Sequence, residues 1–179
     1  MQLKKSLKII IITVSACVFT VISALGTYAF FPQKYKKEVY SVCENTKIDT
    51  SLIFAIIKTE SSFKKDKISP KGAVGLMQIM PDTAEYISKV FFGGNAYNLH
   101  SPKDNILYGV TYLIYLTEKF EDIKTALAAY NAGEGRVYEW LDNKEFSLDG
   151  KTLISIPYNE TKLYVKKVMR YKNFYEILY

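Results

Sequence analysis

The chain has 179 residues with 24 basic and 18 acidic side chains, which gives a formal net charge of +6. This length suits one domain of ordinary size with its own hydrophobic core. Almost all basic residues are lysines, with arginine at Arg136 and Arg170, so the composition argues against binding to nucleic acid. The lone histidine, His100, has no cysteine or histidine partner in the sequence around it, which argues against a zinc site. We expect no cofactor.

The N-terminal segment is apolar enough to be a membrane anchor. Lysines at positions 4, 5 and 8 precede an uncharged run from Ile9 to Phe31. That run is long enough to cross a hydrocarbon core of roughly 30 Å as a helix. We therefore expect a single transmembrane helix in residues 1–31 and a separate domain over residues 32–179.

Two other fates of this segment stay open. A cleaved signal peptide would release a secreted domain, and Thr27-Tyr28-Ala29 offers a cleavage site. Val14-Ser15-Ala16-Cys17 is similar to a lipidation signal. Lysines flank both ends of the apolar run, at Lys8 and at Lys34, so the lysine count does not decide which side the domain faces.

Apolar side chains at three- and four-residue spacing predict a mainly α fold for the rest of the chain. Cys43 shares an apolar face with Val39 and is expected to be a buried small residue that does not pair with Cys17. No clean alternating strand pattern is present. The expected helices cover residues 34–46, 49–60, 82–90, 104–120, 123–132 and 136–141, followed by a last helix capped by Asn159.

Glu60 is the candidate catalytic residue. Asp49 is expected to cap a helix whose apolar face carries Ile56 and Ile57, and Glu60 is the next position on that face. Apolar surroundings disfavour a carboxylate and raise its pKa, as a general acid near neutral pH requires. For an isolated glutamate, a solvated residue at a fraying helix end is the ordinary alternative.

The segment after Glu60 is punctuated by glycine and yet strongly apolar. Gly72 and Gly75 permit backbone conformations that other residues resist, and they let the backbone approach a ligand closely. Residues 76–80 are large and apolar apart from Gln78. By itself this pattern fits a loop that fills the core as well as it fits a binding site.

Four motifs follow one another along the chain, at Glu60–Ala84, Asn105–Leu113, Ala128–Val137 and Glu160–Val165. In order and spacing they resemble the soluble lytic transglycosylase family, over about residues 48 to 175. The resemblance implies a lysozyme-like helical domain that cleaves the glycan strands of bacterial peptidoglycan. It also implies that the domain lies outside the cell membrane, to which the N-terminal helix would hold it.

The resemblance further implies one catalytic carboxylate where most glycosidases use two. Glu60 would protonate the oxygen of the β-1,4 bond between N-acetylmuramic acid and N-acetylglucosamine, and the substrate's acetamido group would stabilise the cationic sugar. Glu60 would then take the proton of the C6 hydroxyl as that oxygen attacks C1. The product would carry a 1,6-anhydromuramyl end.

Supporting roles follow from the same resemblance. Glu160 matches the glutamate of the family's Glu-Thr-Arg motif, although Lys162 replaces the arginine, and a simple first-turn helix acid is an equal alternative. Glu134 stands where the family usually has proline and is expected at the surface. The other residues expected to line the substrate groove are Ser69, Gln78, Met80, Tyr130 and Asn131.

Two further functions stay open. A hydrolytic muramidase related to goose-type lysozyme would need a water molecule and a second acid. A non-catalytic wall-binding or assembly factor would keep the fold without the chemistry. The sequence specifies neither a protein partner nor the cell-wall process served. The candidates for a second acid are Asp66, Asp82, Glu85, Glu134 and Glu160.

Overall fold

The structure is a computed structural model that describes residues 2–179, with side chains from residue 12 onward except residue 24. It contains two compact units that meet in the sequence between Gln33 and Lys34. Helix α1 (Gln2–Phe30) makes up most of the first unit. Its segment Ile12–Phe30 has a mean hydropathy of 1.7 and no buried residue, so by length and composition α1 is a candidate membrane span.

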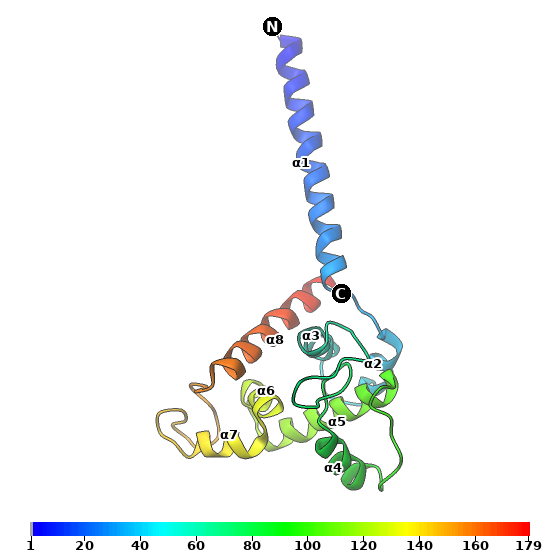
Figure 1. Ribbon diagram of the computed structural model, residues 1–179. Coiled ribbons are helices and arrows are strands. Elements are labelled where there is room, and N and C mark those ends of the chain that lie inside the picture. Colours follow the sequence, from blue (N-terminus) through cyan, green and yellow to red (C-terminus); the bar gives the residue numbers. More distant parts are fainter. Residues whose placement is uncertain (1) are drawn as a thin grey trace. The chain divides into compact units, whose positions relative to one another are not determined.

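The named secondary-structure elements of the second unit are all helices (Figure 1). Across residues 34–179 no strand is present, and isolated bridges join Val74 to Ile68 and to Ile79 within one loop. The prediction of a mainly α fold is confirmed. The helices of this unit are α2 (Lys36–Cys43), α3 (Thr50–Glu60), α4 (Pro81–Phe91), α5 (Pro102–Lys119), α6 (Ile123–Ala132), α7 (Glu134–Leu141) and α8 (Asn159–Leu178).

Helix α3 forms the centre of the hydrophobic core. Every residue from Leu52 to Ile57 is buried, so this helix is surrounded on all sides, unlike a surface helix with one apolar stripe. Helix α8 packs on it, with the rings of Phe54 and Tyr175 5.5 Å apart. Burying each large apolar side chain contributes about 1.5–3 kcal/mol, so α3 is firmly held up to its last turn.

The helix ends follow local sequence signals in most places. The Asp49 carboxylate accepts a 2.8 Å hydrogen bond from the amide of Ser51 at the start of α3. The carboxylate of Asp122 accepts one of the same length from the amide of Thr125 at the start of α6. Gly133, with a φ of 89°, ends α6 as expected.

Four predicted helix starts were wrong. Helix α5 begins at Pro102, two residues before the predicted start at residue 104, and Ser101 is its cap. Helix α2 begins at Lys36 because Tyr35 adopts a left-handed conformation with a φ of 58°. Helix α7 begins at Glu134, two residues before the predicted start at residue 136. Asn159 is the first residue of α8 and not its cap, and the preceding Tyr158 makes no capping hydrogen bond with its side chain.

Candidate active site

The loop between α3 and α4 is fastened to helix α5 by one buried side chain. The side-chain amide nitrogen of Asn105 donates hydrogen bonds to the carbonyl oxygens of Val74 and Leu99, both at 2.9 Å. Its oxygen accepts a 2.8 Å hydrogen bond from the backbone amide of Met77. All three interactions satisfy backbone groups of irregular segments, so Asn105 determines where residues 74–77 lie.

Two glycines allow this close approach. A Cβ atom at Gly75 would lie 2.2 Å from the Asn105 side-chain nitrogen, and the φ of Gly75 is 84°. A Cβ atom at Gly109 of α5 would lie 2.4 Å from the Met77 sulfur and 2.8 Å from its Cβ. Met77 is fully buried at this contact. The motif residues Asn105 and Gly109 therefore position the loop, a role that the sequence analysis did not assign.

Gln78, in the loop between α3 and α4, has a strained backbone conformation. Its φ is 51°, a region that non-glycine residues seldom adopt. Its side-chain nitrogen donates to the carbonyl oxygens of Gly75, at 2.8 Å, and Lys67, at 3.1 Å. Such conformations cost about 1–3 kcal/mol and concentrate at functional sites.

A hollow of about 370 Å³ opens beside Glu60, at the end of α3. The remaining lining comes from the α3–α4 loop, from α6 and from the first turn of α8. The structure thus brings together every residue that the sequence analysis placed in the site. Those residues are Glu60, Ser69, Gln78, Met80, Tyr130, Asn131 and Glu160.

A second hollow, of about 310 Å³, extends the first one. The two share part of their lining, including Lys71, Gln78 and Tyr130, and the second continues to Thr83 and Tyr112. Together they form an elongated groove with Glu60 in its wall. A groove of this kind suits a linear polymer better than a compact small molecule.

The Glu60 carboxyl has the electrostatics of a general acid. Burial at the end of the core helix raises its pKa from 4.5 to about 7. The Tyr164 hydroxyl and the ammonium groups of Lys67 and Lys167 act in the opposite direction but do not outweigh burial. At neutral pH the side chain therefore populates both the protonated and the ionised forms.

Two phenols lie near Glu60. The hydroxyl of Tyr130 donates a 2.9 Å hydrogen bond to the carbonyl oxygen of Met77, so this phenol is engaged by the loop. The buried hydroxyl of Tyr164 makes no hydrogen bond of normal geometry, yet it is close enough to lower the pKa of Glu60. Catalytic hydrogen bonds are often loose before substrate binds, so Tyr164 is a candidate partner of the ionised Glu60.

The other carboxylates differ sharply in position. Asp66, Asp82 and Glu85 are exposed and do not line the groove. Glu160 is exposed and lines the same hollow as Glu60. Within the part of the chain that the structure describes, no group of three or more histidine, cysteine, aspartate or glutamate side chains is placed to hold a metal ion.

Glu134 lies at the surface, as expected, with 36% of its side chain exposed. It is also paired with helix α5, because its carboxylate accepts a 2.9 Å hydrogen bond from the hydroxyl of Tyr115. The Lys119 ammonium lies 3.1 Å from the same carboxylate oxygen. Glu134 is therefore a surface residue of the first turn of α7 that is paired with two side chains of α5.

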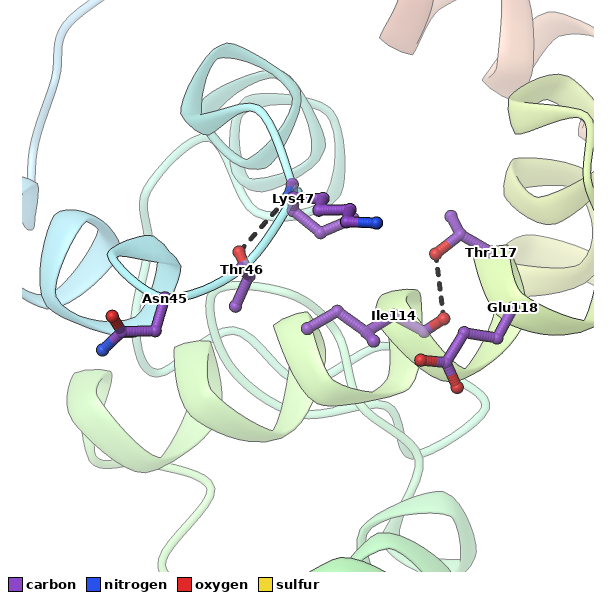
Figure 2. Close-up of a pocket in the computed structure, with 7 residues that line it drawn as sticks. Asn45, Thr46, Lys47, Ile114, Thr117 and Glu118 are labelled. Carbon is purple, nitrogen blue, oxygen red and sulfur yellow. Dashed lines mark hydrogen bonds between the residues drawn. The ribbon is translucent and has the colours of Figure 1, made fainter.

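Another hollow, of about 440 Å³, lies between the α2–α3 connection and the C-terminal half of α5. Figure 2 shows Lys47 and Ile114 on different sides of it, and Glu118 at its edge. None of the residues around Glu60 lines this hollow. Without a perturbed acid or a contact with the groove, it is a poor candidate for the chemistry.

A helical domain with a half-buried, proton-holding glutamate beside an elongated groove defines a lysozyme-like domain. Residues 40–153 match the sequence model of the transglycosylase SLT domain. The chain belongs to this family. The soluble lytic murein transglycosylase of Salmonella typhimurium is 39% identical over 151 residues, which cover 81% of this chain and 23% of that protein. Membrane-bound lytic murein transglycosylase C of Haemophilus influenzae is 34% identical over 150 residues, or 77% of this chain and 40% of that protein.

Solved structures agree with the fold. The crystal structure of the 70 kDa soluble lytic transglycosylase of Escherichia coli matches with a TM-score of 0.74 and 34% identity, over 84% of this chain and 25% of that one. An inactive glutamate-to-glutamine mutant of the Pseudomonas aeruginosa lytic transglycosylase matches with a TM-score of 0.71, 35% identity and coverage of 82% and 24%. The chain spans about a quarter of the length of these soluble relatives.

Proposed function

We propose that this domain is a lytic transglycosylase that cleaves the β-1,4 bond between N-acetylmuramic acid and N-acetylglucosamine in peptidoglycan. One observation carries the proposal: Glu60 combines a pKa of about 7 with a position in the wall of an elongated groove. Membership in the SLT family and relatives named lytic murein transglycosylase support it.

The proposed reaction uses Glu60 twice. The protonated carboxyl donates its proton to the glycosidic oxygen, and the bond from that oxygen to C1 of the muramyl sugar breaks. The substrate's acetamido group supports the positive charge at C1. The C6 hydroxyl then attacks C1 while its proton passes to the Glu60 carboxylate, which restores the acid. No water enters, so the two fragments together contain all atoms of the substrate.

The surrounding residues favour both protonation states in turn. Burial keeps a proton on Glu60 at neutral pH, whereas Tyr164, Lys67 and Lys167 stabilise the carboxylate after proton transfer. In this proposal Ser69, Gln78, Met80, Tyr130 and Asn131 position the glycan against Glu60. Glu160 contributes a second carboxylate to the lining of the same hollow.

Mass spectrometry of fragments released from purified peptidoglycan tests the reaction directly. Internal transfer gives 1,6-anhydro ends, which are about 18 mass units lighter than hydrolytic ends because one water is missing. Mainly reducing muramic acid ends would contradict the proposal. That result would favour the muramidase alternative, which has one observation in its support: Glu160 shares the hollow and could activate a water molecule.

The proposal places the domain outside the membrane, with α1 as an uncleaved single-pass anchor. Helix α1 meets the length and composition of a membrane span, and a membrane-bound relative is among the matching proteins. Peptidoglycan as the substrate requires the outward orientation. A cleaved signal peptide and a secreted domain would be the alternative outcome.

A further inference from the structure

A basic hollow adjoins the loop that follows Glu60. It is a wide, open hollow of about 570 Å³, lined by Tyr35, at the start of the second unit, and by residues 63–68. Lys64, Lys65 and Lys67 line it together with a single acid, Asp66. None of its lining residues belongs to the groove beside Glu60, so this basic hollow is a separate feature of the surface.

More positive charge surrounds the basic hollow. Residues 34–38 and 63–68 together carry six lysines and two acidic residues. Lys34 and Lys167 also lie close enough to Lys58 to reinforce the effect of burial, which lowers the pKa of that ammonium. A surface on which cations repel one another is stabilised when anions approach it.

Residues at and next to the basic hollow have unusual backbone conformations. Tyr35 on one side and Phe63 on the other have φ values of 58° and 64°, and Ser62 next to Phe63 has a φ of 51°. Non-glycine residues keep such conformations only where the surrounding structure imposes them. The backbone that carries Tyr35 and Phe63 at the basic hollow is therefore held in place by the fold.

The position of Tyr35 in the sequence limits its distance from a membrane. It follows Phe30, the last residue of α1, by five residues. Five extended residues reach at most about 18 Å. This limit follows from chain length alone and holds for any orientation of the domain. If α1 spans a bilayer, Tyr35 stays within reach of the lipid headgroups.

We propose that the basic hollow docks on the anionic lipid headgroups of the membrane that holds α1. Lysines near an anionic surface are attracted to it, and a tyrosine ring suits the boundary between headgroups and water. The inference rests on the membrane anchoring proposed above and is independent of glycan cleavage.

Docking would restrain the loop between α3 and α4, which forms part of the groove beside Glu60. The Lys67 ammonium donates to the carbonyl oxygen of Glu60. The Lys67 carbonyl oxygen accepts hydrogen bonds from the amide of Gly75, at 2.8 Å, and from the side chain of Gln78. The docked hollow would therefore hold the groove close to the membrane surface, where it would meet the glycan strands nearest to the lipid.

Hydrogen–deuterium exchange on the full chain in lipid nanodiscs tests the proposal. One set of discs contains phosphatidylcholine alone, and a second set contains phosphatidylcholine with phosphatidylglycerol. We expect residues 62–68 to exchange more slowly in the anionic discs, with the difference lost at high salt. Residues 142–152, an exposed loop with three acidic residues and two lysines, serve as the internal control and should exchange equally in both.

Charge reversal identifies the responsible side chains. The double variant Lys64→Glu, Lys65→Glu should weaken docking by about thirtyfold or more and abolish the protection. Lys67 is left unchanged because of its contact with Glu60. The matched control, Lys124→Glu with Lys151→Glu, makes the same change of charge at exposed positions on α6 and the α7–α8 loop. If the reversed variant unfolds, Lys64→Gln with Lys65→Gln removes the charge with a smaller perturbation.

Two results would overturn the proposal. Equal exchange of residues 62–68 in both discs, with the chain shown to be inserted, would exclude lipid docking. Protection in neutral discs upon addition of inorganic phosphate would indicate a site for small anions and not for a lipid surface. Neither result bears on the cleavage chemistry. If α1 does not insert at all, the chain will not be recovered together with the discs, so this failure is detected separately.

Discussion

Replacing Glu60 with glutamine should abolish cleavage and stabilise the domain above neutral pH. The amide keeps the size of the side chain but has no proton to transfer. General acid–base catalysis contributes about 10²–10⁴ to the rate, so a loss of at least about a hundredfold is expected. This prediction makes the stability of the variant as informative as its activity.

The stability change follows from the pKa of Glu60. In the unfolded chain the carboxyl has its ordinary pKa of 4.5, whereas in the folded domain the value is about 7. The folded state therefore holds more protons between these values, and stability falls as pH rises from 4.5 to 7. The difference corresponds to about 3 kcal/mol above pH 7. Below pH 4.5 the group is protonated in both states and there is no penalty.

Glu60→Gln removes this penalty, so it should unfold several degrees higher than the wild type at pH 8 and close to the wild type at pH 4. Thermal unfolding followed by circular dichroism measures the shift, and mass spectrometry of released glycan measures activity. Glu85→Gln is the matched control, because Glu85 is exposed and paired with Lys89 on α4. It should leave activity unchanged.

Two outcomes would contradict the reasoning. A well-folded Glu60→Gln variant that still cleaves peptidoglycan would remove Glu60 from the catalytic role. An inactive variant with the same stability as the wild type at pH 8 would show that Glu60 is not desolvated. In that case the raised pKa could not explain how the acid keeps its proton.

Three further predictions concern the surroundings of Glu60 and the anchor. Tyr164→Phe should raise the pKa of Glu60 further, because the Tyr164 hydroxyl lowers it. The alkaline limb of the pH–rate profile should then move to higher pH. An unchanged limb would exclude contact between the two groups. Asn105→Ala should destabilise the domain by about 2–5 kcal/mol in urea unfolding, because three backbone groups, two of them in buried hydrogen bonds, lose their partner. A change below about 1 kcal/mol would refute this role. After cell fractionation, the mature chain should remain in the membrane with its N-terminal segment, and a soluble chain beginning near Phe30 would show cleavage instead.

Local sequence signals account for much of the fold. Asp49 and Asp122 cap helices where they were expected to, because a side-chain oxygen needs only an amide two or three residues away. The apolar spacing before Glu60 predicted both a buried helix and a perturbed acid at its end. Tyr35 could not be foreseen in this way, since a left-handed tyrosine is contrary to its own preference and depends on the surrounding fold.

The roles of Asn105 and Glu134 show what sequence periodicity misses. Asn105 binds backbone groups of residues that precede it by 28 and 31 positions, and nothing near it in sequence indicates those partners. Glu134 finds Tyr115 across 19 positions. A buried asparagine inside an apolar helix pattern was the one available signal, because such a residue requires partners for its amide.

The position of Glu60 destabilises its ionised form, and the packing of the core offsets this cost. Six consecutive buried residues of α3, from Leu52 to Ile57, anchor the helix whose last residue is the acid. Their burial outweighs the cost of about 3 kcal/mol for an ionised Glu60 and the strain at Gln78. A more exposed helix end would relieve that cost but would return the pKa toward 4.5 and leave too little acid at neutral pH. The same burial that makes the domain less stable above neutral pH is therefore what equips Glu60 to donate a proton there.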